Sequence, residues 1–386
     1  MHPKLSHLSK EEIGQLIQRF YNKEKLSDLI TEFRIDTKTT MLNKLFPPTI
    51  CETLYCPYCE NINLISHYES RNSFNIKSAP LCPSCGHVTG EYCRCDNCRQ
   101  YARLRAERKK DKQRSLILEK CSSIFIPPHE VQELSFEASV YLMALTRHSI
   151  SEDFRFLFLF DKTQVKLAPT FDFIKQMQVS LKECGLISVS PESKIDCFTF
   201  NEEVTAITAY YPSEVQWELL PSFSAQEKKA YIAKLQEMIV SGNWPEHWQT
   251  ECKVLWRALV LDECIEYLIY LLESRHFKEI EVGEKTKAAF DALLEEFSIA
   301  QIFNLSWQSV RDMVDSLTVK GIPHFQAVNV FTGTLLRKAD RALAQGWIVK
   351  DARRDFNCPQ SVVSSTLFNL FLKLGDSAWT TKVPGG

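Results

Sequence analysis

The chain has 386 residues, 45% of them hydrophobic, which is enough for two to four compact units with sizeable cores. Its 12 glycines and 24 phenylalanines argue against a collagen-like or disordered chain and favour a helix-rich protein. The net charge of −2 hides an asymmetry. Residues 1–120 carry 20 Lys and Arg against 14 Asp and Glu, a net charge of +6, and the remainder carries 26 against 34, a net of −8. We therefore expect any polyanion to meet the N-terminal third.

Residues 9–46 have the spacing of three short helices. Ser9 followed by Glu12 is a capping box, and apolar residues then recur on one helical face. A third helix is expected after Asp36, with its inner side formed by Met41, Leu42, Leu45 and Phe46. This head has helix-turn-helix proportions, and its third helix would present residues suited to base edges and phosphates: Lys38, Thr39, Thr40, Asn43 and Lys44. A helical protein-docking module is the alternative.

Seven of the fourteen cysteines lie between Cys56 and Cys98, a clustering that favours metal binding in a reducing cytosol over a secreted disulfide scaffold. Two C-x₂-C pairs, Cys56/Cys59 and Cys82/Cys85, stand 22 residues apart. Each such turn places two thiolates on one side of an ion, and two turns complete the tetrahedron that Zn²⁺ prefers. The segment resembles the zinc-ribbon family, which implies a fold element and a structural zinc but no reaction.

Three further thiols, Cys93, Cys95 and Cys98, predict a second zinc with His87 as the nearest fourth ligand. Cys51 and His67 are other candidates for that position. A rival arrangement joins Cys82/Cys85 to Cys95/Cys98 and leaves Cys56/Cys59 to other partners. Spacing alone does not choose between these arrangements, so one or two zinc ions are expected.

A strongly basic helix or linker, residues 99–120, follows the last thiol of this cluster directly. Such a patch would bind phosphates with a strong dependence on salt and little preference for sequence. A solvated helix with surface salt bridges is the alternative. Its candidate contacts to nucleic acid are Arg99, Arg103, Arg105, Arg108, Lys109, Lys110 and Lys112.

Residues 125–215 resemble winged-helix domains in the order of their elements. Helices are expected over 134–145 and 170–184, with an apolar strand or buried helix at 154–160 between them. Residues 186–189 and 196–200 alternate like two strands of one hairpin, the wing, with Lys194 at its tip. Lys175 and Lys182 would face a nucleic acid, although many such domains bind protein.

Residues 216–380 read as an acidic helical body. Within it, residues 298–318 suggest another helix-turn-helix, in which Ser298 and Ser306 cap the two helices and residues 304–306 form the turn. Asp312 and Asp315 would repel phosphate, so this element is expected to serve packing or self-association.

Together these patterns predict a mainly α (α+β) protein with four parts: a helical head (1–48), a zinc-ribbon-like module with its basic segment (49–120), a winged-helix-like domain (125–215) and a helical body (216–380). No nucleotide-binding or hydrolase motif and no apolar run of 18 residues is present. We therefore expect a cytoplasmic, non-enzymatic protein that binds DNA, with duplex as the favoured form. It would be a transcription regulator or an accessory factor, such as one of a mobile-element or phage-defence system. The alternative is a scaffold that recruits protein partners through its acidic body, with zinc purely structural and no membrane contact.

Overall fold

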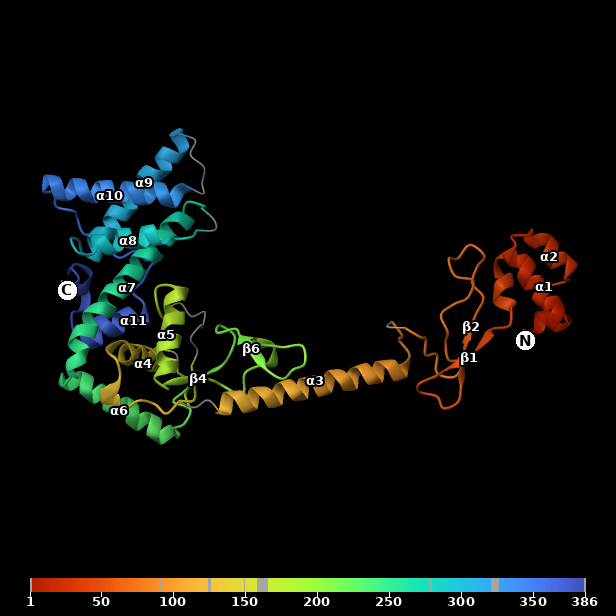
Figure 1. The fold of residues 1–386 in the computed structure, drawn as a ribbon. Helices are drawn as coiled ribbons and strands as arrows, with labels where there is room; N and C mark the ends of the chain where they lie inside the picture. The colour runs from red at the N-terminus through yellow and green to blue at the C-terminus, as the bar shows by residue number, and fades with distance from the viewer. Residues whose placement is uncertain are drawn as a thin grey trace. The chain divides into compact units, whose positions relative to one another are not determined.

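The computed structural model describes residues 2–90, 92–123, 126–148, 150–157, 166–277, 280–320 and 326–384. The protein is mainly helical with small antiparallel sheets, and its contacts divide it into two compact units, Met1–Lys112 and Gln113–Gly386 (Figure 1). Within the described ranges, none of the helices combines the length and the apolar character needed to cross a membrane.

The first unit begins with a helical head. It contains the 3-10 helix η1 (Pro3–Leu5), α1 (Lys10–Tyr21), α2 (Leu26–Glu32) and the 3-10 helix η2 (Thr39–Leu45). The capping box predicted at the start of α1 is confirmed, since the Ser9 hydroxyl and the Glu12 carboxylate each accept a backbone N–H of the other residue.

The third segment of the head differs from its prediction. It is a 3-10 helix rather than an α-helix, and Lys38 precedes it without a side-chain cap, so Asp36 does not cap it. Leu42, Leu45 and Phe46 are buried as expected, whereas Met41 is exposed. A seven-residue 3-10 helix has three residues per turn, so it presents a different set of side chains from the α-helix that the apolar spacing suggested.

The metal module follows with strands β1 (Thr49–Tyr55) and β2 (Asn63–Ser66), which pair antiparallel. The loop after β2 packs back onto the head, where the Tyr21 hydroxyl donates to the carbonyls of Glu69 and Ile76 at 2.6 and 3.0 Å. Tyr68 packs edge-on against Phe46 in the same core. The head and the metal module therefore form one compact unit.

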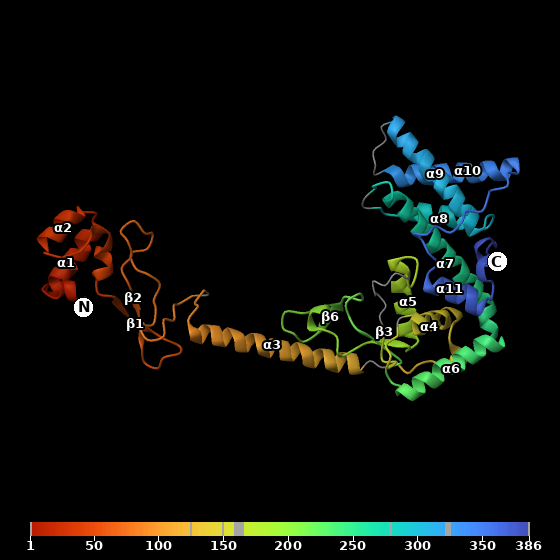
Figure 2. The same ribbon diagram turned by 180° about the vertical axis from the view of Figure 1, so that it is seen from behind.

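Helix α3 (Asp96–Ser123) crosses the division between the two units. Among the described residues of the second unit, the longer helices are α4 (Phe136–His148), α5 (Phe171–Glu183), α6 (Ala225–Ser241), α7 (Glu246–Glu273), α8 (Glu284–Leu293), α9 (Ile299–Lys320) and α10 (Ala327–Gln345). Its short helices include the 3-10 helices η3 (Val131–Glu133), η4 (Ile195–Cys197) and η7 (Gly375–Trp379), the α-helix α11 (Val362–Ser365) and the π-helix η6 (Thr366–Phe371). Helix α4 packs against α5 and α7, α7 against α8 and α9, and α9 against α10 (Figures 1 and 2). One continuous apolar core joins residues from 117 to 378.

The predicted wing hairpin is wrong. Strand β4 (Ile187–Val189) pairs with β7 (Trp217–Leu219), not with β5 (Phe198–Phe200), in a sheet of order β3-β7-β4. Strand β5 pairs instead with β6 (Ile207–Tyr210). Lys194 consequently precedes a 3-10 helix rather than occupying a wing tip. Of the apolar run 154–160, residues 156–157 form β3, and 158–160 lie outside the described residues.

The expected turn at 304–306 is also absent, because α9 runs unbroken through it. Ser306 and Ser309 are almost completely buried in this helix, and the Ser309 hydroxyl donates to the Leu305 carbonyl four residues earlier. Asn304 donates its amide to the Lys350 carbonyl at 2.7 Å. Of the residues that suggested a turn and a cap, Asn304 therefore bonds the segment after α10 and Ser306 is buried within the helix.

Gly185, just after α5, provides a test of this fold. Its φ of 69° is left-handed, and a Cβ there would collide with the carbonyl oxygen of Ile126 and lie 2.8 Å from that of Pro127. Gly185→Ala is expected to destabilise the second unit by about 2–4 kcal/mol, because strain and overlap add. Urea unfolding followed by tryptophan fluorescence measures this, since all seven tryptophans lie beyond residue 112.

Gly242→Ala is the matched control for this test. Gly242 has a φ of 76° at the end of α6, but nothing lies within 4 Å of the added Cβ. Its cost should be about 1 kcal/mol, from the backbone alone. Equal losses at the two positions would show that the close approach to Ile126 is not part of the folded state.

Two carboxylates on α7, one of them buried (Glu266) and one partly buried (Asp262), lead us to expect that the stability of the second unit depends on pH. Burial raises the pKa of Asp262 to about 6 and that of Glu266 to about 7, although Thr170 and Lys166 donate to them. The folded state then binds more protons than the unfolded chain between pH ~4 and ~7, so the free energy of unfolding falls as pH rises through this window. Tryptophan-monitored unfolding should show lower stability at pH 8 than at pH 5, and Asp262→Asn with Glu266→Gln should remove most of the difference. A wild-type stability that increases from pH 5 to pH 8 would contradict this.

Candidate metal centres and basic helix

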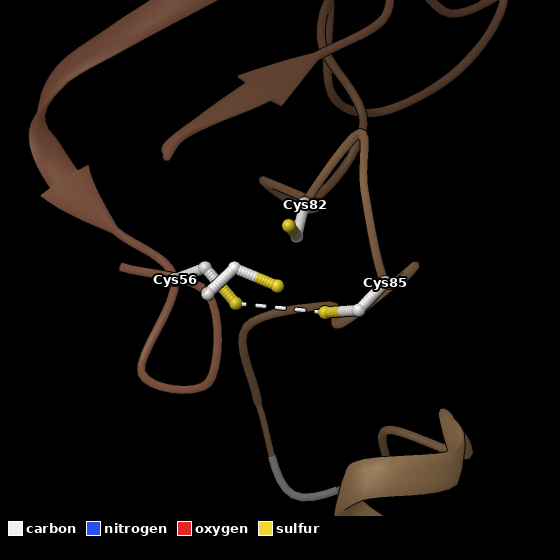
Figure 3. Close-up of side chains that lie close together, drawn as sticks. Cys56, Cys82 and Cys85 are labelled. Atoms are coloured by element: carbon white, nitrogen blue, oxygen red, sulfur yellow. Dashed lines mark hydrogen bonds between the residues drawn. The ribbon is translucent and has the colours of Figure 1, made fainter. Parts of the chain in front are cut away.

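The first cysteine set brings four sulfur atoms together from two turns of the chain. The Sγ atoms of Cys56, Cys59, Cys82 and Cys85 all lie within 4.8 Å of one another, and those of Cys56 and Cys85 are 3.6 Å apart. Figure 3 shows the side chains of Cys56, Cys82 and Cys85 turned toward a common centre. Cys56 and Cys82 are buried beside Leu64, so this centre is shielded from solvent on one side.

Backbone hydrogen bonds shape both turns. The N–H of Cys56 donates to the Ile62 carbonyl at 2.9 Å, and the N–H of Cys82 donates to the His87 carbonyl at 2.7 Å. In the second turn Gly86 has a φ of 69°, a left-handed conformation that glycine adopts without a steric penalty. The change of chain direction at Gly86 also places the next residue, His87, beside the cysteines of the second set.

The second set consists of His87, Cys93, Cys95 and Cys98, whose ligand atoms again all lie within 4.8 Å of one another. The Nδ1 atom of His87 is 3.3 Å from the Sγ of Cys98 and 3.9 Å from that of Cys95. All four residues are partly exposed, in contrast to the half-buried first set. Each set could hold a metal ion.

These distances fit a tetrahedral ion. Zinc–sulfur bonds of about 2.3 Å in a tetrahedron place two sulfurs about 3.8 Å apart, and a zinc-bound imidazole nitrogen about 3.6 Å from a sulfur. The observed separations of 3.3 to 3.9 Å bracket these values. Four protein ligands in each set would leave no open position for a reacting water, which is the pattern of structural rather than catalytic sites.

The electrostatics of the thiols favour a cation at both centres. Backbone N–H groups of Cys95 and Val88 lower the pKa of Cys93 to about 6, and those of Cys85 and Ser84 lower the pKa of Cys82 to about 7. Burial raises the pKa of Cys85 to about 12, and the sulfurs of the three neighbouring cysteines raise it further in the same direction. A bound divalent cation would ease this conflict, because it would offset part of the thiolate charge at each centre.

The other candidate ligands lie outside both sets. Cys51 is on β1, with its Sγ 3.7 Å from the Ser66 hydroxyl, and His67 is exposed. The structure places Cys82 and Cys85 with Cys56 and Cys59, and not with Cys95 and Cys98 as in the rival arrangement.

The second centre lies at the beginning of α3. Cys95 immediately precedes the helix and Cys98 lies in its first turn, where the Cys98 N–H donates to the Cys95 Sγ at 3.4 Å. At the other end of α3, Ile117 is fully buried and Arg114 donates to the Ser193 carbonyl at 2.8 Å. Between these ends every residue from 99 to 112 is exposed. This segment is exposed along its whole length, so the ordered residues at both ends of α3 support it as a helix.

The cations of this helix divide into two faces. Residues three or four positions apart share a face, so Arg105, Arg108, Lys109 and Lys112 form one stripe, which we call the basic stripe. Among the described residues, none of these four has an ion-pair partner. Arg99, Arg103 and Lys110 lie on the other side, where Arg99 pairs with Asp96 at 3.6 Å and Arg103 with Glu107 at 3.0 Å.

The remaining predicted contacts lie elsewhere. Lys38, Thr40 and Lys44 are exposed in and beside the 3-10 helix of the head. Lys175 and Lys182 are on α5 in the second unit, and each lies over an aromatic ring: Lys175 over Phe171 and Lys182 over Tyr210. Lys175 also pairs with Asp172 at 3.0 Å.

Sequence reasoning missed Tyr58. Its hydroxyl lies 3.4 Å from the Sγ of Cys98, and its ring packs edge-on against the His87 ring at a centroid distance of 5.2 Å. The residue lies inside the first C-x₂-C turn, so it links the two centres. Only its position between two ligands could have drawn attention to it.

Comparison with models of protein families, with curated proteins and with solved structures finds no match to this chain.

Proposed function

We propose that this chain is a non-enzymatic nucleic-acid-binding protein in which two structural zinc ions hold the start of a basic helix. The basic stripe carries the proposal: four exposed cations on one helical face have no ion-pair partner among the described residues, while Asp96 and Glu107 pair with Arg99 and Arg103 on the other face. Phosphate groups are the ligands that such a row of Arg and Lys binds best. DNA is the form that we expect, for a protein acting as a regulator or an accessory factor.

The identity of the metal is part of the proposal. Seven thiolates and one imidazole form a soft, tetrahedral donor set, which suits zinc better than magnesium or calcium. A zinc ion at the second centre would offset two of the three thiolate charges of Cys93, Cys95 and Cys98, so most of the negative charge beside the stripe would be compensated.

Salt dependence of binding tests the proposal. Fluorescence anisotropy of a labelled 20-nucleotide probe with the full zinc-loaded chain should give an affinity that falls steeply between 50 and 300 mM salt, with a slope of about −3 to −4 in log–log form if the four cations of the stripe each contact one phosphate. Absence of binding at 50 mM salt would exclude the proposal.

A second candidate function, recruitment of a protein partner, is favoured by one observation. In the segment after α10, Ile348 and Phe356 are 93% and 94% exposed and Trp347 is 54% exposed. Apolar side chains exposed to this degree are common in protein-binding surfaces. This candidate is compatible with nucleic-acid binding by the first unit, and it becomes the principal one if the salt titration shows no binding.

A further inference from the structure

Two tyrosines lie at the metal-bound end of the basic stripe. Tyr101 is 63% exposed and lies one helical turn after the ligand Cys98. It precedes Arg105 by four residues and Arg108 by seven, so it belongs to the same face of α3 as the stripe. Tyr58 is 39% exposed and contacts Cys98 and His87. It therefore lies beside the first turn of α3, close to the end of the helix that carries Tyr101.

An exposed tyrosine ring on a basic surface is suited to stacking on a nucleobase. Stacking of one base on an aromatic side chain typically contributes about 1–3 kcal/mol. In a continuous duplex each base is already stacked between its neighbours and its faces are not available. The phosphates of a duplex can reach the basic stripe, but only an unpaired base can reach the ring of Tyr101.

The dimensions of the helix are consistent with a short strand. Tyr101 and Lys112 are eleven residues apart, which corresponds to about 16 Å along an α-helix. Over this length the face of the helix that carries the stripe offers one aromatic ring at the start and the four cations of the stripe behind it. A strand of a few nucleotides can therefore place one base on the ring and its successive phosphates along the stripe.

Building on the proposed function, we propose that this face of α3 recognises unpaired nucleotides, in a single strand or a single-stranded extension of a duplex. Tyr101 stacks on a base, Tyr58 supports the same end of the track, and Arg105, Arg108, Lys109 and Lys112 hold the backbone. Preference for unpaired nucleotides then comes from the ring, whereas affinity for any nucleic acid comes from the cations. The duplex preferred on the sequence alone becomes the weaker ligand.

The experiment compares two probes with the full zinc-loaded chain. Anisotropy at 100 mM salt is measured with a labelled 20-nucleotide polypyrimidine strand and with a 20-base-pair duplex. Tyr101→Ala is expected to weaken binding of the single strand about 5- to 100-fold, which corresponds to the loss of one stacked base, and to leave the duplex affinity unchanged. Tyr101→Phe keeps the ring and should retain the wild-type affinity for both probes.

Phe74→Ala provides the matched control. Phe74 is fully exposed in the same unit, but it lies in the loop after β2 and contacts neither metal centre. Its removal should leave both affinities unchanged. If the single strand is bound no better than the duplex, or if Tyr101→Ala changes both affinities equally, the inference is wrong while the proposed function stands. If the wild-type chain binds neither probe, the proposed function itself fails.

Discussion

Cys82→Ser is expected to remove one of the two zinc ions that we propose and to unfold the metal module of the first unit. The core of this module consists of little more than Cys56, Leu64 and Cys82, so apolar burial alone cannot hold it together. Structural zinc contributes roughly 10 kcal/mol or more to folding, and three remaining ligands would forfeit most of that. Metal content per chain should fall from two zinc ions to one, and limited proteolysis should cut between residues 49 and 95.

Cys51→Ser is the control for this substitution. Cys51 is a partly buried cysteine of the same module, on strand β1, but it lies outside both ligand sets and contacts Ser66 instead. This variant should keep two ions and the protease resistance of the wild type. A Cys82→Ser chain that keeps both ions and resists protease would show that the sulfurs of the first set do not hold a metal.

The second large effect is expected from neutralising the basic stripe. Arg105→Gln, Arg108→Gln and Lys109→Gln together should weaken binding of a 20-nucleotide probe about 100-fold at 100 mM salt, because three charge-assisted contacts of about 1 kcal/mol each are lost. The log–log salt slope should become shallower by about 2 for a single strand and nearly 3 for a duplex. Glutamine has a helix propensity close to those of Arg and Lys, so α3 should persist.

A triple variant on the opposite face of α3 tests whether binding depends on the position of the cations or only on the overall charge of the helix. Arg99→Gln, Arg103→Gln and Lys110→Gln remove the same three charges from the same helix, but Arg99 and Arg103 are already paired with Asp96 and Glu107. Binding should weaken less than 10-fold and the salt slope should change little. Equal losses in the two triple variants would mean that net charge alone attracts the ligand, with no binding face on α3.

Local sequence signals predicted the cysteine and histidine residues that the structure brings together and the cationic segment that follows them. The C-x₂-C turns and the run of cations are encoded within a few residues, because metal ligands and helical charges need only short-range spacing. The same holds for the capping box of Ser9 and Glu12, which the structure reproduces. The spacing of three and four residues in the sequence is also enough to place the cations of the basic stripe on one helical face. The sequence does not show, however, that these cations have no ion-pair partner among the described residues.

Predictions that depended on distant partners failed. Strand β4 has the alternation of a hairpin strand, but its partner β7 begins 30 residues after β4 does and not in the next segment. Residues 304–306 have the composition of a turn, yet burial of Leu305 and of the preceding Phe303 in the core keeps α9 continuous. In both cases tertiary packing outweighed local propensity.

The sequence by itself determined that this protein has clustered cysteines with the spacing of metal ligands, a cationic segment directly after them and a helix-rich body, because composition and short spacing specify these features. Only the tertiary structure decided which sulfurs share a centre, that His87 completes the second set, and that Tyr58 rests against it. It alone also decided that the basic stripe stays exposed and unpaired. The physical reason is that a ligand set or a binding face is a relation between residues distant in the chain, and the packing of the whole unit brings those residues together.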